Sequence, residues 1–213
     1  MTGAAPPADP QQPADDAALA AALVAIDPRG TGASLRAPPG PARDRWLALL
    51  RAGLPPDAPV RRLPASAPDG RLLGGLDLAA TLAAGRPVAD RGLLAEADGG
   101  VVLVAMAERL PPASAACVAA VLDDGAVAAE RDGLSLRHPA RIGVVALDEG
   151  LEPEERPAAA LLDRVAFHLG LDAQPCPCAA ATPSEIAAAR ARLPEVGAAD
   201  EAVLRALCEA AMA

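Results

Sequence analysis

Two uninterrupted apolar runs in the middle of the chain restrict its fold more than any other feature. Val101–Ala107 reads VVLVAMA and follows two glycines, and Ile142–Leu147 reads IGVVAL. A strand with one face in water alternates apolar and polar residues, whereas a strand covered on both faces does not. These runs therefore predict buried strands of a parallel sheet. Because such strands alternate with helical segments along the chain, the fold class is α/β.

The neighbouring segments supply the other expected elements. An Ala/Leu helix ends at Asp27-Pro28, and ASLR (33–36) is a candidate strand. Two extended arms around Asp132-Gly133 predict a hairpin. Residues 1–16, which are acidic and rich in proline, predict a disordered tail. Further helices are expected at 43–54, 74–85, 114–122, 158–163, 184–193 and 199–213, a loop at 55–70, and a short strand after Arg164.

The composition excludes several classes of function. All 19 basic residues are arginine, and the chain has neither lysine nor asparagine. A net charge of −9 argues against non-specific binding to nucleic acid or to an anionic membrane. No uncharged apolar stretch reaches the roughly 18 residues that a membrane helix needs. The N-terminus is not a secretory signal, and four scattered cysteines favour a reducing cytoplasm.

Residues 32–50, GASLRAPPGPARDRWLALL, have the outline of a phosphate-binding site, with an apolar segment, a Gly/Pro turn and a helix. A working loop reads GxxxxGK[ST], in which backbone N–H groups and the lysine hold phosphates and the hydroxyl binds Mg²⁺. Here the loop starts at Ala37, contains Gly40, and has Arg43 and Asp44 at the lysine and hydroxyl positions. Three prolines remove N–H donors from it. The sequence predicts that the frame persists without a working triphosphate site.

Two further parts of such a site are also missing. Mg²⁺ binding and water activation need an acidic pair at the end of a buried strand, where this chain has Ala105 and Met106. Glu108 lies beyond them and is expected to be a solvated charge at a helix start. A polar residue, usually asparagine, would end the next strand, where Leu147 and Asp148 stand.

Arg164 stands where a helix passes into a strand, in LLDRVAF, directly after Asp163. Charged side chains are exposed by default, so an ordinary surface arginine is one interpretation. The other is an arginine finger, a cation offered to the γ-phosphate at a neighbouring subunit's site, where it accelerates turnover about 10³–10⁵-fold. The hairpin tip, Arg131, Asp132 and Gly133, is a second candidate for contact with a partner because it projects from the core.

The histidines and cysteines predict no metal site. His138 and His168 would need further ligands to bind a metal and are expected to be structural. Cys176 and Cys178 lie in CPC, within an expected linker, and two more ligands near them would be required for zinc.

Three segments taken together resemble one protein family. They are GRLLGGLDLAATLAAGRPVADRGLLAEADGGVVLV from Gly70, AERDGLSLRHPAR from Ala129, and RPAAALLDRVAFHL from Arg156. In this order they resemble the AAA+ module of magnesium chelatase, with the frame extending back to Asp27. The decayed loop, the missing acidic pair and the intact LLDR are similar to the family's D subunit, the ATPase-inactive partner of its motor subunit.

The resemblance implies a three-layer α/β/α AAA+ fold with a parallel sheet of the P-loop type and the start of a helical lid. The family's hairpin insertion corresponds to Ala129–Ala140 and its helix insertion to about Leu72–Leu94. The implied organisation is a tail at 1–16, a degenerate AAA+ core at 17–172, a linker at 173–183 and an incomplete lid at 184–213. The chain is therefore expected to be a fragment or a truncated product.

The resemblance also implies a function. In this family, motor and D subunits form hetero-oligomeric rings that drive ATP-dependent Mg²⁺ insertion into protoporphyrin IX, held by a large porphyrin-binding subunit, for (bacterio)chlorophyll biosynthesis. The family's arginine finger corresponds to Arg164, and Asp163 is expected at the interface. ATP and Mg²⁺ would be bound by the motor partner, and this chain alone would be catalytically inactive. A regulatory module that binds ATP through Arg43 without turnover, and a pure scaffold, remain as alternatives.

Overall fold

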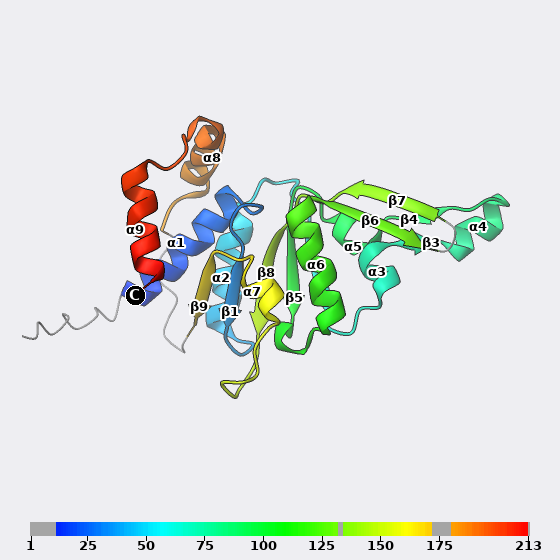
Figure 1. Cartoon of the computed structure of the whole chain (residues 1–213), viewed down its shortest axis with the longest axis horizontal. Coiled ribbons are helices and arrows are strands. Elements are labelled where there is room, and N and C mark those ends of the chain that lie inside the picture. Colours follow the sequence, from blue (N-terminus) through cyan, green and yellow to red (C-terminus); the bar gives the residue numbers. More distant parts are fainter. Residues whose placement is uncertain (1–11, 132–133, 172–179, 213) are drawn as a thin grey trace, which may run out of the picture.

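A five-stranded sheet forms the centre of the computed structural model, which describes residues 12–131, 134–171 and 180–212 (Figure 1). Its strand order is β2-β5-β8-β1-β9, and every neighbouring pair is parallel. The strands are β1 (Ala33–Arg36), β2 (Val60–Pro64), β5 (Val101–Ala105), β8 (Gly143–Asp148) and β9 (Phe167–Gly170). Both continuous apolar runs contain a fully buried strand, β5 and β8, as the sequence predicts, although β5 ends at Ala105, before Met106 and Ala107.

One face of the sheet is covered by α1 (Gln12–Ile26) and α2 (Pro41–Gly53), with α8 (Pro183–Arg192) packed on that pair. Trp46 is fully buried in this layer, and its indole N–H donates to the carbonyl of Ala17 at 2.8 Å. Trp46 therefore joins α2 to α1 within the core.

The contacts of α8 attach it firmly to the α1–α2 pair. Ile186 is 4% exposed and belongs to the same apolar cluster as Trp46. The guanidinium of Arg190 donates to the carbonyl oxygens of Ala25 and Gly53, in the last turns of α1 and α2. Such carbonyls have no partner within their own helices, so one cation satisfies two helix ends.

The other face is covered by a second group of helices, and its core contains Leu72, Leu94, Val118 and Leu161. These helices are α3 (Asp69–Leu73), α5 (Gly92–Glu96), α6 (Pro112–Asp124) and α7 (Ala159–Leu162). Helices on both faces of a parallel sheet give the three layers expected from the family resemblance.

An arm extends away from the sheet (Figure 1). Its hairpin consists of β6 (Ala126–Arg131) and β7 (Leu134–Pro139), which pair antiparallel as predicted. Beside the hairpin lie β3 (Gly75–Leu76) and β4 (Ala89–Asp90), with α4 (Leu78–Ala84) between them in sequence. The hairpin-tip residues Asp132 and Gly133 lie outside the described residues.

Two expectations about local structure are wrong. The expected loop at 55–70 contains β2, an edge strand whose two exposed arginines and terminal proline hide it from a search for apolar runs. Edge strands tolerate both residue types because one side of the strand has no partner to pair with. The expected tail at 1–16 overlaps α1, which begins at Gln12. Pro13 suits the first turn of a helix.

The remaining elements are the 3₁₀ turns η1 (Ala107–Arg109) and η2 (Leu193–Glu195), and α9 (Glu201–Ala211). The expected linker at 173–183, with Cys176 and Cys178, lies mostly outside the described residues. Within the described part, no helix has both the length and the apolar character needed to cross a membrane.

Candidate functional site

The degenerate loop has the geometry that the sequence predicts. It joins the end of β1, in the middle of the sheet, to the start of α2, with Gly40 at the cap position of the helix. The backbone N–H of Ala37, the first of the loop, donates to the carbonyl of Asp148 at 3.0 Å. Since Pro38, Pro39 and Pro41 have no N–H, the loop has few backbone donors left for a phosphate.

Arg43, at the lysine position, is turned into the protein. Its side chain is 8% exposed, and Nη1 donates to Oε1 of Glu149 at 2.7 Å. Nε of Arg43 is buried and has no hydrogen-bond partner among the described residues. A carboxylate of the same chain therefore lies against the cation that the family resemblance would assign to a phosphate.

Two further acidic residues lie near Glu149 in the structure. Asp148 is 3% exposed, and its carboxylate accepts from Arg36 at 3.1 Å. Glu108 has a side chain only 4% exposed, and its Oε2 accepts the backbone N–H of Glu149 at 3.0 Å. The expectation that Glu108 is a solvated charge is therefore wrong, because η1 turns its side chain inward toward the end of β8.

The residues at this end of the strands do not fit ATP with Mg²⁺. Ala105 and Met106 stand where the acidic pair for Mg²⁺ would lie, and neither has an acidic side chain. Ala105 is also buried, and Met106 adopts a left-handed conformation with φ of 47°. Leu147, at the end of the next strand, is also buried. Among the described residues, no group of three histidine, cysteine, aspartate or glutamate side chains is placed to hold a metal ion.

Arg164 follows α7 and precedes the edge strand β9. Nε and Nη2 donate to the two carboxylate oxygens of Asp123, at 2.8 and 2.6 Å, and Nη1 donates to the carbonyl of Ala160 at 2.9 Å. Asp123 lies in the last turn of α6. The Arg164 side chain is 34% exposed, so it is oriented by its own chain and still reaches solvent. Asp163 is exposed beside it.

Arg164 and the degenerate loop lie at opposite ends of the parallel strands. Arg164 is at the amino-terminal end, before β9, and the loop is at the carboxyl-terminal end, after β1. Ala166 donates to the carbonyl of Thr31, which precedes β1, whereas Ala37 follows β1. The four residues of β1 separate the two ends, which amounts to about 13 Å at the usual rise of a strand. Arg164 therefore cannot act on a phosphate at its own chain's loop.

The ion pair between Arg164 and Asp123 makes a prediction for titration. Hydrogen bonds from Arg164, with its charge as a smaller contribution, hold the pKa of Asp123 below its ordinary value despite some opposing desolvation. A lowered folded-state pKa means that the pair persists above the unfolded-state pKa and is lost as pH falls through the folded-state pKa. In Arg164→Gln, the pKa of Asp123 should rise toward the ordinary value, as followed by carboxyl ¹³C NMR.

Asp98 is the internal control for that titration. Its pKa is also lowered, chiefly by a hydrogen bond from Arg141. It should titrate identically in the wild-type protein and in Arg164→Gln. An Asp123 pKa that stays low in the variant would show that Arg164 is not its partner in solution.

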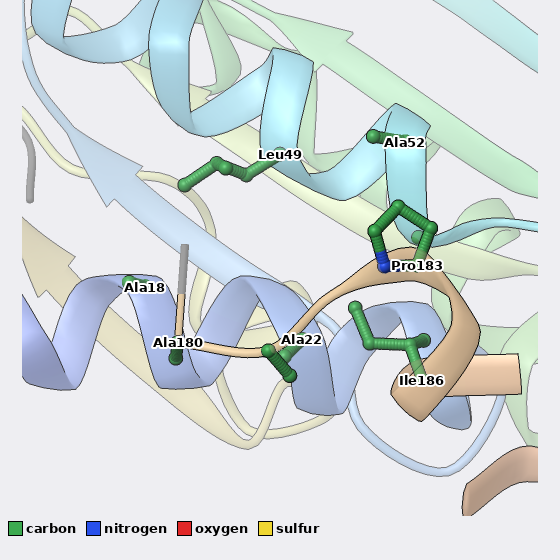
Figure 2. A pocket seen from close by; sticks show the side chains of 9 residues that line it. Ala18, Ala22, Leu49, Ala52, Ala180, Pro183 and Ile186 are labelled. Carbon is green, nitrogen blue, oxygen red and sulfur yellow. The ribbon is translucent and has the colours of Figure 1, made fainter. Parts of the chain in front are cut away.

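Two hollows lie apart from the degenerate loop. A cleft of about 160 Å³ is lined by Ser34, Arg36, Asp148, Arg156 and His168, together with neighbouring apolar residues, but not by the degenerate loop. A smaller hollow of about 40 Å³ lies between α1, α2 and α8 (Figure 2). Its lining is apolar, with Leu49, Pro183, Ile186 and several alanines, and its volume suits one or two water-sized molecules rather than a nucleotide.

The other predicted site residues are not brought together. Arg131 ends β6 in the projecting arm, and Asp132 and Gly133 are not described. His138 lies on β7 and His168 on β9, in different sheets. The sequence reasoning missed Glu149 and Asp123, the partners of the two key arginines. Glu149 follows β8 directly, so its position at a strand end was the available signal.

No protein-family model matches the chain. It is 42% identical to the magnesium-chelatase 60 kDa subunit of Cereibacter sphaeroides over 91% of this chain and 32% of the relative. It is 39% identical to the magnesium-chelatase 38 kDa subunit of Acidiphilium rubrum over 50% of this chain and 30% of the relative. The chain therefore spans about a third of the length of these curated relatives.

The fold is similar to that of a chain in the complex between subunits BchI and BchD of magnesium chelatase, obtained from a cryo-EM reconstruction at 7.5 Å. The TM-score is 0.58 at 24% identity, over 84% of this chain and 64% of the other. This likeness confirms the α/β fold of the AAA+ type. The sequence similarity relates the chain to magnesium-chelatase subunits of both sizes.

Proposed function

We propose that this chain is the AAA+ part of a D-type magnesium-chelatase subunit that does not hydrolyse ATP and supplies Arg164 to the ATP site of a neighbouring motor subunit. One observation carries the proposal. The chain's own loop has its cation neutralised by Glu149, whereas Arg164 is partly exposed at the opposite end of the strands. In a ring in which each ATP lies between subunits, this chain can lose the phosphate site at its own loop, but it cannot lose Arg164, which acts at the neighbour's ATP.

The pattern of similarity supports the D type. The match to the 60 kDa subunit extends over 91% of this chain and the match to the 38 kDa subunit over 50%. The D type corresponds to the larger of these subunits. A chain that is inactive alone is also consistent with Ala105 and Met106 at the metal-pair position.

The proposed partners follow from this role. A 38 kDa-type motor subunit would bind the ATP and Mg²⁺ of the complex in a hetero-oligomeric ring in the cytoplasm. A large porphyrin-binding subunit would hold protoporphyrin IX, into which Mg²⁺ is inserted as a substrate. The projecting arm with the hairpin β6–β7 and the exposed Asp163 are the proposed contact surfaces on this chain.

The test is reconstitution with a 38 kDa-type subunit. The chain alone should show no ATP turnover, and the mixture should elute as one complex in size-exclusion chromatography with turnover above that of the motor subunit alone. A chain that fails to associate, or that hydrolyses ATP by itself, would contradict the proposal.

One observation favours a second candidate, a regulatory module that binds ATP without turnover. Arg43 keeps a cation at the lysine position, and its Nε has no partner among the described residues. Equilibrium dialysis with ATP and Mg²⁺ separates the two functions. We expect no binding at micromolar ATP because Glu149 neutralises Arg43; micromolar binding that Arg43→Ala abolishes would favour the regulatory module.

A further inference from the structure

We propose that the Glu149 carboxylate is an internal ligand that takes the place of a phosphate at the degenerate loop and thereby keeps nucleotides out of it. The inference rests on the proposed function, because it treats the loop as a former nucleotide site. The added point is that a carboxylate of the chain itself occupies the former phosphate position, in addition to the loss of the lysine.

Arg43 is placed to require an anion. It lies in the first turn of α2, a helix of 13 residues, and the whole residue is 7% exposed. A guanidinium removed from water is costly unless a negative charge compensates it. Nε of Arg43 has no partner among the described residues. The negative charge that compensates the guanidinium is the carboxylate of Glu149, which accepts a hydrogen bond from Nη1.

Glu149 is held in position by groups on either side of it. Its backbone N–H donates to Oε2 of Glu108, which follows β5. The preceding residue, Asp148, pairs with Arg36 and also accepts the backbone N–H of Gly150 at 3.0 Å. These bonds hold the backbone of the turn after β8, from which the Glu149 side chain reaches Arg43.

Three arginines at this end of the strands are each paired with a carboxylate of the same chain. Among the described residues, Glu108, Asp148 and Glu149 pair with Arg109, Arg36 and Arg43 in that order. A di- or triphosphate entering here would have to displace Glu149 from a mostly buried ion pair and then lie close to the displaced carboxylate. Breaking such a pair, and placing like charges together, both oppose binding.

Removal of the Glu149 carboxylate should therefore create a site for inorganic phosphate or for the phosphates of a nucleotide. The experiment measures thermal unfolding of the wild-type protein, Glu149→Ala and Glu149→Gln, with inorganic phosphate titrated against chloride at constant ionic strength. A ligand that binds only the folded state raises Tm, by about 3–6 °C when its concentration is tenfold above Kd. Both variants should show such a rise, and the wild-type protein should not.

Asp98→Ala is the matched control, because it removes the carboxylate partner of another arginine, Arg141, at the opposite end of the strands. It should respond to phosphate as the wild-type protein does. Adding Arg43→Leu to Glu149→Ala should abolish the response, which would identify Arg43 as the phosphate-binding group.

Each outcome decides the inference. A phosphate response in the wild-type protein, or Glu149 variants that respond no more than Asp98→Ala, overturns it. If the variants do not fold in chloride, their refolding in phosphate is measured instead, and failure to refold there also overturns it. These results do not depend on Arg164. The inference can therefore fail while the proposed function stands, and the proposed function can fail while the inference stands.

Discussion

In a complex reconstituted with a motor-type subunit, Arg164→Ala should lower ATP turnover at least about 10³-fold, the lower end of the effect of an arginine finger supplied in trans. The physical reason is the charge that develops on the γ-phosphate in the transition state, which a guanidinium can neutralise without reorganisation. ATPase rate at saturating ATP is the measurement, with size-exclusion chromatography confirming that the variant still assembles.

Arg141→Ala is the matched control for this variant. Arg141 also pairs with an aspartate, precedes a strand at the same end of the sheet, and has a side chain that is 60% exposed. It should leave turnover within about twofold of wild type, because the finger role is assigned to Arg164 alone and an exposed ion pair contributes little. If Arg164→Ala assembles and is as active as Arg141→Ala, the chain is a scaffold and the finger role is wrong.

Asp123→Asn tests how Arg164 is oriented. The bidentate pair with Asp123 fixes the guanidinium plane while part of the side chain faces solvent. If that orientation is used in the complex, Asp123→Asn lowers turnover less than Arg164→Ala does, and the double variant is no worse than Arg164→Ala alone. Effects that instead multiply would show that Asp123 acts separately from Arg164.

The second large effect concerns stability. Trp46→Ala should reduce the free energy of unfolding by about 3–5 kcal/mol, because it empties a fully buried site. That is a large share of the roughly 5–15 kcal/mol of a typical domain. Because Trp46 is the sole tryptophan, its fluorescence is lost with the substitution, and urea unfolding followed by far-UV circular dichroism is the suitable measurement.

Trp46→Phe separates the two contributions of this side chain. Phenylalanine retains most of the apolar contact but cannot donate the hydrogen bond that the indole N–H makes to Ala17. Its cost should be smaller than that of Trp46→Ala, with about 0.5–1.5 kcal/mol from the lost hydrogen bond, because the Ala17 carbonyl lies inside α1 and keeps its helical donor. Leu82→Ala, at a side chain 83% exposed, should be close to neutral. A loss below about 1 kcal/mol in Trp46→Ala would contradict the central place of Trp46 in the core.

The sequence allowed the central strands and the loop frame to be predicted because local pattern decides both. The runs at β5 and β8 are apolar since both of their faces are covered, and Pro38, Pro39 and Pro41 restrict the backbone at the start of α2. The edge strand β2 was missed for the opposite reason. Its pairing with β5 comes from the tertiary structure, whereas its own residues, including Arg61 and Arg62, show no apolar run.

The candidate site could be predicted only in part. Arg43 and Arg164 were found from their positions in a motif, but their partners depend on how distant segments meet. Glu149 is 106 residues from Arg43 in sequence, and Asp123 is 41 residues from Arg164. The burial of Glu108 depends similarly on the turn after β8, and no local pattern reports it.

The attachment of α8 has a mechanical consequence. Because Arg190 donates to the terminal carbonyls of both α1 and α2, and Ile186 is buried beside them, α8 is attached to the sheet through these two helices. Any swing of α9 relative to the sheet must then pivot within residues 193–200, which connect the two helices. A force on α9 would then pass through α8 to α1 and α2, the helices that bury Trp46.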